Sequence, residues 1–374
     1  MPCRITDRTP KQDGFFMPAE FSPIRQVWML WPERPDNWRD GAKPAQAAYA
    51  RVAEAVARFA DVTVGVSCAQ YENCRAKLPP SVRVVEIASN DAWVRDCGPT
   101  FLKNAAGETR AADWEFNAWG GLYDGAYFPW DKDAAVARKI CEIERVDSYR
   151  PRGFVLEGGS IIADGEGTVI TTESCLLNPN RNPGLTRQQI EEKLRTYLGF
   201  EKVIWLNEGI DLSAGETDGH VDDICSFIGP AEVVCCYTED TTNEYYKVFK
   251  NCYEILCNST DAKGRKLKVH KLTACKPFRI TKEEAENVLV SQGVGQNPDG
   301  KWRKEGDFAV PSYANFLITN GSIIFPVYGL DTDEEAVACL ERIVAGRYTV
   351  RPVNAHEIAL CGGSIHCFTQ QVAK

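Results

Sequence analysis

Hydrophobic and polar residues alternate along the chain in the manner of a mixed α/β protein. Three short apolar runs have the length and composition of strands, over residues 26–31, 62–66 and 82–87. Between the first two runs, apolar residues recur at helical spacing over about 44–59, at Ala48, Val52, Val56 and Phe59. A shorter helix is predicted over 69–77, since the prolines that follow it cannot continue a helix. The third strand then leads into a polar loop over 90–99.

The chain also repeats short stretches of its own sequence. Residues 156–162 and 360–366 share the order Gly-Gly-Ser-Ile, and 320–324 carry a fainter copy. Residues 96–102 and 222–227 occupy equivalent places in other segments. Repetition of one supersecondary unit favours a closed, radially arranged fold, although a strand-entry turn that recurs by chance would look the same. The repeats predict five units, with anchors at positions 96, 157, 222, 321 and 363.

Composition narrows the function classes. The 374 residues are 44% hydrophobic and 25% charged, as expected of a globular protein with a large core. Lys and Arg number 43 against 52 Asp and Glu, a net charge of −9. This balance argues against nucleic acid or an anionic membrane as the partner and suits a small cationic molecule. No linker, secretory signal or membrane span is apparent, so we expect residues 1–374 to form a single cytoplasmic domain.

The cysteine and histidine pattern bears on metals and cofactors. Fifteen cysteines include no Cys-x-x-Cys pair, and the four histidines form no His-Glu-x-x-His motif. Most thiols of a reducing compartment are small buried hydrophobes rather than metal ligands or disulfide partners. We therefore expect chemistry that uses neither a metal ion nor an organic cofactor.

Four segments place polar or nucleophilic residues beside glycines at predicted strand ends: 93–96, 157–160, 216–222 and 362–367. Glycine allows close approach of the backbone to a ligand, and loops at strand ends commonly carry reactive groups. If these segments converge, they supply a thiol, an imidazole and several carboxylates. Cys361, on the near side of the last glycine pair, is the main rival to Cys367 as the reactive thiol.

Such a set favours a cationic substrate. A thiol reacts as the thiolate, and carboxylates crowded around it oppose its ionisation. A guanidinium resolves this conflict, because its planar fork of N–H donors matches carboxylates bidentately and its charge favours the thiolate. Attack on the guanidinium carbon, loss of ammonia and hydrolysis by a water activated by the imidazole would amount to deimination.

Each candidate also has an ordinary structural interpretation. Cys367 could be a buried structural thiol, His220 a loop cap, Glu157 a surface carboxylate and Trp93 a core residue. Asp96 could pair with its neighbour Arg95. In favour of a site, the spacing of His220 and Asp222 would put both on one face of a strand. By the same alternation, His366 should point away from Cys367.

Several long motifs resemble the agmatine deiminase family. They are residues 11–20, the run Trp31–Arg39, Asn90–Asp96, Asn117–Gly121, Leu176–Pro183 and the terminal Gly362–Gln371. The resemblance spans nearly the whole chain. It implies membership of the guanidine-modifying (pentein) superfamily and a five-bladed, pseudo-symmetric α/β propeller of ββαβ units around a central active-site channel. The implied reaction converts agmatine and water to N-carbamoylputrescine and ammonia.

The resemblance also implies roles for individual residues. Cys367 would be the nucleophile and His220 the general acid and base. Glu157 would assist proton transfer and bind the guanidinium, while Asp96 and Asp222 would hold its remaining nitrogens. A further set would shape the substrate pocket, namely Trp93, Gly363 and Glu216, the last beside the distal ammonium of agmatine.

Three alternatives stay open at this point. A deiminase for arginine or peptidyl-arginine, or an amidinotransferase, would use much the same catalytic set with a different tail pocket. Ribosome-binding factors of the same fold lack that set, whereas this chain retains it.

The stretch 275–306 departs from the family pattern, which leaves substrate access and oligomer contacts open there. We expect a homo-oligomer with no nucleic-acid or membrane partner.

Overall fold

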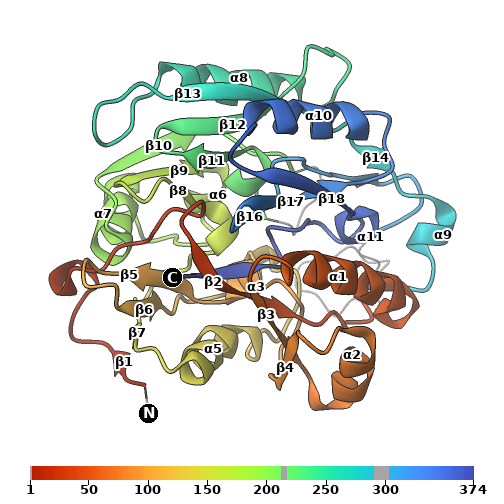
Figure 1. Ribbon diagram of the computed structural model, residues 1–374, viewed down its shortest axis with the longest axis horizontal. Coiled ribbons are helices and arrows are strands. Elements are labelled where there is room, and N and C mark those ends of the chain that lie inside the picture. Colours follow the sequence, from red (N-terminus) through yellow and green to blue (C-terminus); the bar gives the residue numbers. More distant parts are fainter. Residues whose placement is uncertain (1, 212–216, 290–302) are drawn as a thin grey trace.

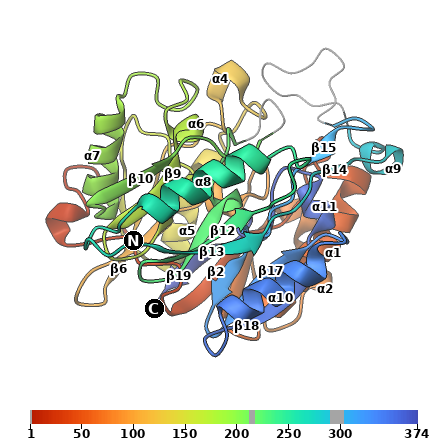
Figure 2. The same cartoon turned by 90° about the horizontal axis from the view of Figure 1, so that it is seen from above.

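The computed structural model describes residues 2–211, 217–289 and 303–374 of the chain. These residues form a mixed α/β fold whose strands group into six sheets. Helices α5 (Val136–Glu144), α7 (Arg187–Leu198), α8 (Tyr246–Asn258) and α10 (Asp333–Ile343) lie on the outside of the molecule, with the strands between them (Figure 1). Seen from above, the short helix α4 (Gly121–Asp124) stands out from the body (Figure 2). Within the described ranges, no helix is both long and apolar enough to cross a bilayer.

Five of the six sheets share one strand order. A first strand pairs antiparallel with a second, and the second pairs in parallel with a third. These sheets are β5 (Thr100–Lys103), β6 (Thr109–Ala112) and β7 (Ser148–Tyr149); β8 (Ile162–Ala163), β9 (Thr168–Thr172) and β10 (Lys202–Leu206); β11 (Cys225–Gly229), β12 (Glu232–Tyr237) and β13 (Lys268–Thr273); β16 (Leu317–Thr319), β17 (Ser322–Val327) and β18 (Thr349–Asn354); and β19 (Gln370–Ala373), β2 (Ile24–Leu30) and β3 (Asp61–Val66). The other strands are β1 (Arg4–Ile5) beside β7, β4 (Arg83–Glu86) beside β3, and the two-stranded sheet of β14 (Phe278–Arg279) and β15 (Phe308–Ala309).

A helix crosses from the second to the third strand of each of these five sheets, because parallel strands cannot be joined by a tight turn. The crossover helices are α5, α7, α8, α10 and α1 (Lys43–Val56). Helix α7 begins with a capping box, in which Thr186 and Gln189 satisfy each other's backbone N–H groups, and it ends at Gly199, whose φ of 78° suits glycine. The remaining helices are short: α2 (Tyr71–Lys77), α3 (Val94–Cys97), α6 (Glu173–Leu176), α9 (Lys282–Ala285), α11 (His356–Ala359) and the 3₁₀ turns η1 (Lys11–Asp13), η2 (Arg39–Ala42), η3 (Cys68–Gln70), η4 (Asp133–Ala135), η5 (Gly158–Ser160) and η6 (Val221–Asp223).

The regular elements predicted from hydrophobic periodicity are confirmed. The predicted strands are β2, β3 and β4, the helix over 44–59 is α1, and the helix over 69–77 is η3 followed by α2. Two local predictions are wrong. Part of the loop over 90–99 forms the one-turn helix α3, and His220 and Asp222 do not lie on a strand. They belong to the 3₁₀ turn η6, since β11 begins only at Cys225.

A turn or loop stands ahead of the first strand of each of the five sheets. It is α3, η5 or η6 in three sheets, the segment 312–316 before β16, and the segment 360–369 before β19. The expected anchor at 321 is placed differently from the others. Gly321 lies in the turn between β16 and β17 at a φ of 80°, and Asn315 occupies the place ahead of the first strand.

Pairing of β19 with β2 joins the carboxyl end of the chain to its beginning. Phe368, next to Cys367, stacks on Tyr49 of α1 with ring centroids 4.0 Å apart and an interplanar angle of 23°. Both rings are fully buried in the larger hydrophobic core. This packing fixes the segment between α11 and β19 against a regular helix.

We expect Phe368→Ala to lower the free energy of unfolding by about 3–5 kcal/mol, because it leaves a cavity beneath that segment. Tyr49→Phe is the matched control. It keeps the ring, and within the described chain its buried hydroxyl has no hydrogen-bond partner. Its loss should therefore change stability by about 1 kcal/mol or less. Urea unfolding measures both, and equal losses in the two variants would contradict the role given to the ring stack.

Candidate active site

The side chains singled out in the sequence lie just ahead of the first strands of four sheets. Asp96 lies in α3 ahead of β5, and Glu157 immediately precedes η5 and β8. His220 and Asp222 lie at the start of η6 ahead of β11, and Cys367 lies between α11 and β19. All five side chains are buried. The shared strand order therefore carries them to a common place from distant parts of the chain.

Gly159 lies where three of these side chains meet. A Cβ atom at this position would lie 2.6 Å from His220 Nδ1, 2.9 Å from Asp222 Oδ2 and 3.0 Å from Asp96 Oδ1. The Gly159 N–H also donates to Asp96 Oδ1 at 3.0 Å. Glycine is therefore the residue that leaves room for this cluster.

The His220 imidazole lies between two carboxylates. Its Nδ1 is 3.9 Å from Asp96 Oδ1, and its Nε2 is 3.9 Å from Glu157 Oε2. Both distances are too long for a hydrogen bond, and neither ring nitrogen finds a partner in the part of the chain that is described. Buried polar groups are normally paired. The ring is thus placed to exchange protons with a molecule held between these acids.

Glu157 is held by a buried ion pair. Arg181 Nε donates to Glu157 Oε1 at 2.7 Å, and Arg181 Nη2 donates to the Thr217 carbonyl at 3.0 Å. This fixes one carboxylate oxygen. The other, Oε2, has no hydrogen-bond partner among the residues described. Arg181 was not predicted to be a site residue. In the sequence analysis it appears only as part of the 176–183 motif.

The Cys367 thiol faces a carboxylate and an amide. Its Sγ is 3.6 Å from Asp222 Oδ2, and Asn315 Nδ2 donates to Sγ at 3.0 Å. Burial and the negative charges of Asp222 and Asp223 raise the pKa of the Cys367 thiol well above its usual value. The uncharged thiol is therefore the resting form at neutral pH.

Within the described ranges, no arginine or lysine pairs with Asp96 in the way that Arg181 pairs with Glu157. The Asp96 oxygens accept from the Gly159 N–H and, at 3.0 Å, from Trp119 Nε1. Burial raises the pKa of Asp96 above its usual value. His220 opposes this rise, while the charges of Asp222 and Glu157 add to it. A cation bound beside Asp96 would relieve this cost.

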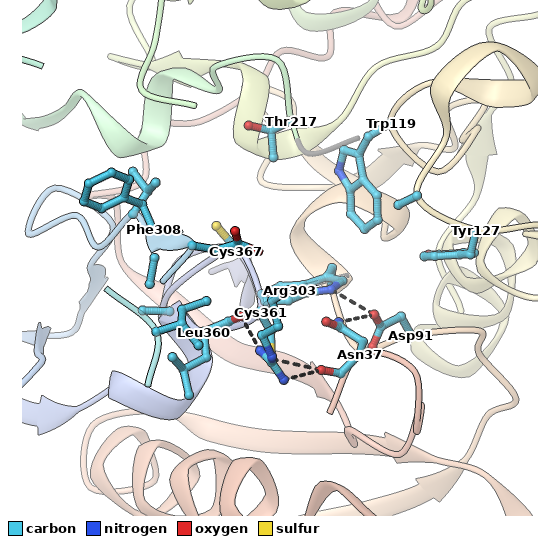
Figure 3. Close-up of a pocket in the computed structure, with 18 of the residues that line it drawn as sticks. Asn37, Asp91, Trp119, Tyr127, Thr217, Arg303, Phe308, Leu360, Cys361 and Cys367 are labelled. Carbon is cyan, nitrogen blue, oxygen red and sulfur yellow. Dashed lines mark hydrogen bonds between the residues drawn. The ribbon is translucent and has the colours of Figure 1, made fainter. Parts of the chain in front are cut away.

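A cavity opens onto the cluster (Figure 3). Its lining includes the acids Asp91 and Asp96, the aromatic residues Trp93, Trp119 and Tyr127, and Cys367. The Trp93 ring stacks on Trp38 with centroids 5.4 Å apart. Gly363 makes this arrangement possible, because a Cβ there would lie 2.5 Å from the Trp93 ring. Trp93 thus lies at the cavity and Gly363 packs against its ring, but contact of either residue with substrate stays a prediction.

The divergent stretch 275–306 contributes Arg303 to the cavity wall. Figure 3 shows its guanidinium reaching the Asn37 carbonyl, at 2.7 Å, and the Leu360 carbonyl. Arg303 Nη1 is also 3.1 Å from Cys361 Sγ. Burial raises the pKa of Cys361 to about 11, and Arg303 opposes the rise. Cys361 Sγ otherwise contacts the Asn37 and Glu357 carbonyls, whereas Cys367 Sγ contacts Asp222 and Asn315. Of the two thiols, Cys367 is therefore the one that lies against the acidic cluster.

Two further expectations have definite outcomes. The prediction that His366 points away from the site is wrong, because its Nδ1 lies 2.8 Å from Asp222 Oδ2. Strand alternation does not apply there, since β19 begins only at Gln370.

Arg95 pairs with Glu20 at 3.2 Å rather than with Asp96. Glu216, expected beside the distal ammonium, lies outside the described residues.

Two groups of side chains have donor atoms within 4.8 Å of one another, as a metal site requires. They are Glu157 with Cys175 and His220, and Asp222 with Asp223 and Cys367. Arg181 lies against the first group and opposes a cation there. The sequence's expectation of chemistry without metal or cofactor stays a prediction.

Comparison with known proteins places the chain in a family. The family model for Porphyromonas-type peptidyl-arginine deiminase matches residues 16–373. The chain therefore belongs to this family of guanidine-modifying enzymes, as its motifs indicated.

Relatives within the family are similar over their whole length. A curated protein of Enterococcus faecalis is 52% identical over 374 residues, covering 100% of each chain. An agmatine deiminase of Pseudomonas fluorescens is 52% identical over 364 residues, covering 97% of this chain and 96% of its own. A solved structure of the agmatine deiminase of Enterococcus faecalis superposes with a TM-score of 0.93 at 51% identity, covering 100% of this chain and 99% of that one.

We expect Gly159→Ala to lower kcat/KM by about 100-fold or more, because the added methyl group displaces His220 and Asp222. Gly184→Ala is the matched control, since a Cβ there meets no atom within 4 Å. Its kcat/KM should equal that of the wild type. Steady-state kinetics and thermal unfolding of both variants test this, and a fully active Gly159→Ala would contradict the assigned geometry.

The raised pKa of Cys367 makes its reaction with iodoacetamide strongly pH-dependent. We expect exposed Cys68 to react faster at about pH 7, and the ratio of Cys367 to Cys68 modification to grow toward about pH 9.5. Peptide mass spectrometry measures the ratio. Faster modification of Cys367 than of Cys68 at neutral pH would show that the resting thiol is ionised.

Proposed function

We propose that this protein hydrolyses agmatine to N-carbamoylputrescine and ammonia through a covalent intermediate on Cys367. The agmatine deiminases among its full-length relatives support the reaction and the substrate. The observation that carries the proposal is the buried ring of Asp96, Glu157 and Asp222 around a thiol and an imidazole. This concentration of negative charge suits a flat cation.

The unpaired oxygens of these carboxylates match the N–H donors of a guanidinium. Glu157 Oε2 and Asp222 Oδ1 are both buried without a hydrogen-bond partner in the described chain. In the proposed complex they accept N–H groups of the guanidinium, and Asp96 accepts another. Trp93 covers the aliphatic stem, since an aromatic face suits both methylene groups and a cation.

The substrate itself completes the catalytic site. Its positive charge lowers the pKa of the Cys367 thiol, whose proton passes to His220, and the thiolate attacks the guanidinium carbon. His220 then returns the proton to a terminal nitrogen, so that the C–N bond breaks and ammonia leaves. A thiouronium on Cys367 remains.

Hydrolysis reverses the roles of the same groups. A water molecule in the place of the ammonia gives a proton to His220 as its oxygen bonds to the thiouronium carbon. The C–S bond then breaks, the remaining hydroxyl proton passes to the Cys367 sulfur, and N-carbamoylputrescine leaves. His220 gives up its proton to solvent, where it converts the released ammonia to ammonium, so that the starting forms of both groups are restored. Glu157, 3.9 Å from His220 Nε2 and fixed by Arg181, stabilises the protonated imidazole in both halves.

Arginine or peptidyl-arginine is the second candidate substrate class. The family takes its description from peptidyl-arginine deiminase, and Arg303 places a cation at the cavity that could face a carboxylate. However, the Arg303 N–H groups already donate to the Asn37 and Leu360 carbonyls. Asp91 adds a carboxylate to the cavity wall, which favours a distal ammonium over a carboxylate, although its oxygens already accept N–H groups of Asn37, Trp38 and Trp93. The family resemblance adds Glu216, which lies outside the described residues, to the same preference.

For the whole chain we propose a single domain, residues 1–374, of five ββαβ units arranged as a propeller around this site. The shared strand order of five sheets supports this arrangement. The position of Asp96, Glu157, Asp222 and Cys367 ahead of four first strands supports it as well. That the protein acts in the cytoplasm as a homo-oligomer stays a prediction from the sequence.

Ammonia release from agmatine, arginine and a peptidyl-arginine, measured side by side, tests the proposal. We expect agmatine to be preferred and Cys367→Ala to lose roughly 10⁴-fold or more in kcat. Cys361→Ala is the matched control, because it removes the rival thiol, and it should retain activity. Faster turnover of arginine would overturn the choice of substrate, and an active Cys367→Ala would overturn the mechanism.

A further inference from the structure

His366 links the proposed active site to a second buried layer of charge. Its Nδ1 is 2.8 Å from Asp222 Oδ2, and its Nε2 is 2.8 Å from Glu20 Oε2. The imidazole, Asp222 and Glu20 are all buried. The catalytic scheme described above uses Asp222 but neither His366 nor Glu20. A buried ring with a carboxylate at each nitrogen therefore needs a separate explanation.

The charges around His366 favour its protonated form. Burial and the Arg95 cation lower the pKa of His366, but the contacts with Glu20 and Asp222 outweigh them, and the pKa lies above its usual value. Burial alone would raise the pKa of Glu20, yet His366 and Arg95 hold it at about 2. Glu20 therefore stays ionised, and both ring nitrogens of His366 can donate.

The contact with His366 leaves the two oxygens of Asp222 in different states. Oδ2 is held by His366 and lies 3.6 Å from Cys367 Sγ. Oδ1 is buried without a hydrogen-bond partner among the described residues. Rotation of the Asp222 carboxylate would break the contact with His366. The contact therefore fixes the orientation of the carboxylate and the direction in which its free oxygen points. That oxygen is the one that the proposed substrate complex uses.

We propose that His366 is a positioning residue, which together with Glu20 aims the free oxygen of Asp222 at the guanidinium. This inference rests on the proposed function. It predicts that substrate binding and turnover depend on a side chain that does not itself touch the substrate. Arg95 completes the layer, since its Nη1 lies 3.2 Å from Glu20 Oε1 and its Nε donates to the His366 carbonyl at 3.3 Å.

Two substitutions of His366 separate positioning from simple packing. In His366→Asn the amide nitrogen takes the place of Nδ1 and can still donate to Asp222, whereas in His366→Gln it takes the place of Nε2 and faces Glu20. We expect His366→Asn to retain kcat/KM within about 10-fold and His366→Gln to lose about 100-fold or more, with a raised KM for agmatine. A packing role alone would affect the two variants alike, so equal losses, or none, would overturn the inference.

Glu20→Gln supplies an independent readout. Without the Glu20 charge the pKa of His366 falls, so the imidazole loses its proton as the pH rises. We expect the ratio of variant to wild-type kcat/KM to fall by about 10-fold between about pH 6 and about pH 9. The titratable and charged groups facing His366 are Asp222, Glu20 and Arg95, and the variant changes Glu20 alone. A ratio independent of pH would overturn the inference.

His270→Asn is the matched control. The Nε2 of His270 on β13 pairs with Glu232 Oε1 on β12 at 2.7 Å, and Asn has no atom in the place of Nε2, so this variant removes a similar contact elsewhere. Its kcat/KM should equal that of the wild type. Thermal unfolding of every variant reports folding separately from activity. Wild-type turnover of agmatine in the same assay tests the proposed function by itself. Its absence would overturn that function, whereas normal wild-type activity with unaffected His366 and Glu20 variants would overturn only the positioning role.

Discussion

The structure depends on negative charge that is buried around one small space. Asp96, Glu157 and Asp222 are all buried, and burial of an ionised carboxylate is costly unless the charge is paired and hydrogen-bonded. The protein compensates each acid differently. Arg181 pairs with Glu157 and His366 contacts Asp222, whereas the hydrogen bonds that Asp96 accepts from the described residues come from the neutral N–H groups of Gly159 and Trp119. The remaining deficit of positive charge is what a guanidinium would supply.

This deficit also accounts for the state of the thiol. The same charges that would attract a cation raise the pKa of Cys367, so the thiol resists ionisation. In the proposed mechanism, binding of the cation reverses the local field and activates the thiol when its target is in place. Selectivity and activation thus have one physical origin, and Arg181 and His366 must neutralise part of the charge without cancelling all of it.

Much of the fold, and the convergence of the residues singled out in the sequence, could be predicted because both leave local patterns. The strands β2, β3 and β4 follow from apolar runs, and Cys367, His220 and Glu157 stand near glycines at which the structure leaves little or no room for a side chain. The partners of these residues could not be found in this way. Arg181 and Asn315 contact side chains from other sheets, and nothing in their own neighbourhood marks them. The direction of His366 was missed because alternation was assumed where no strand exists.

Asn315 shows that one position of the repeated unit can carry a different chemical group in different sheets. It lies ahead of β16, the place that carries Asp96, Glu157 or Asp222 in three other sheets, but it presents an amide instead of a carboxylate. Asn315 Nδ2 donates to Cys367 Sγ at 3.0 Å and to Asp223 Oδ1 at 3.0 Å. A carboxylate there would add another negative charge next to the sulfur and oppose the thiolate further. In the proposed mechanism, a neutral donor at this one position would stabilise the ionised sulfur while the carboxylates at the other positions hold the cation.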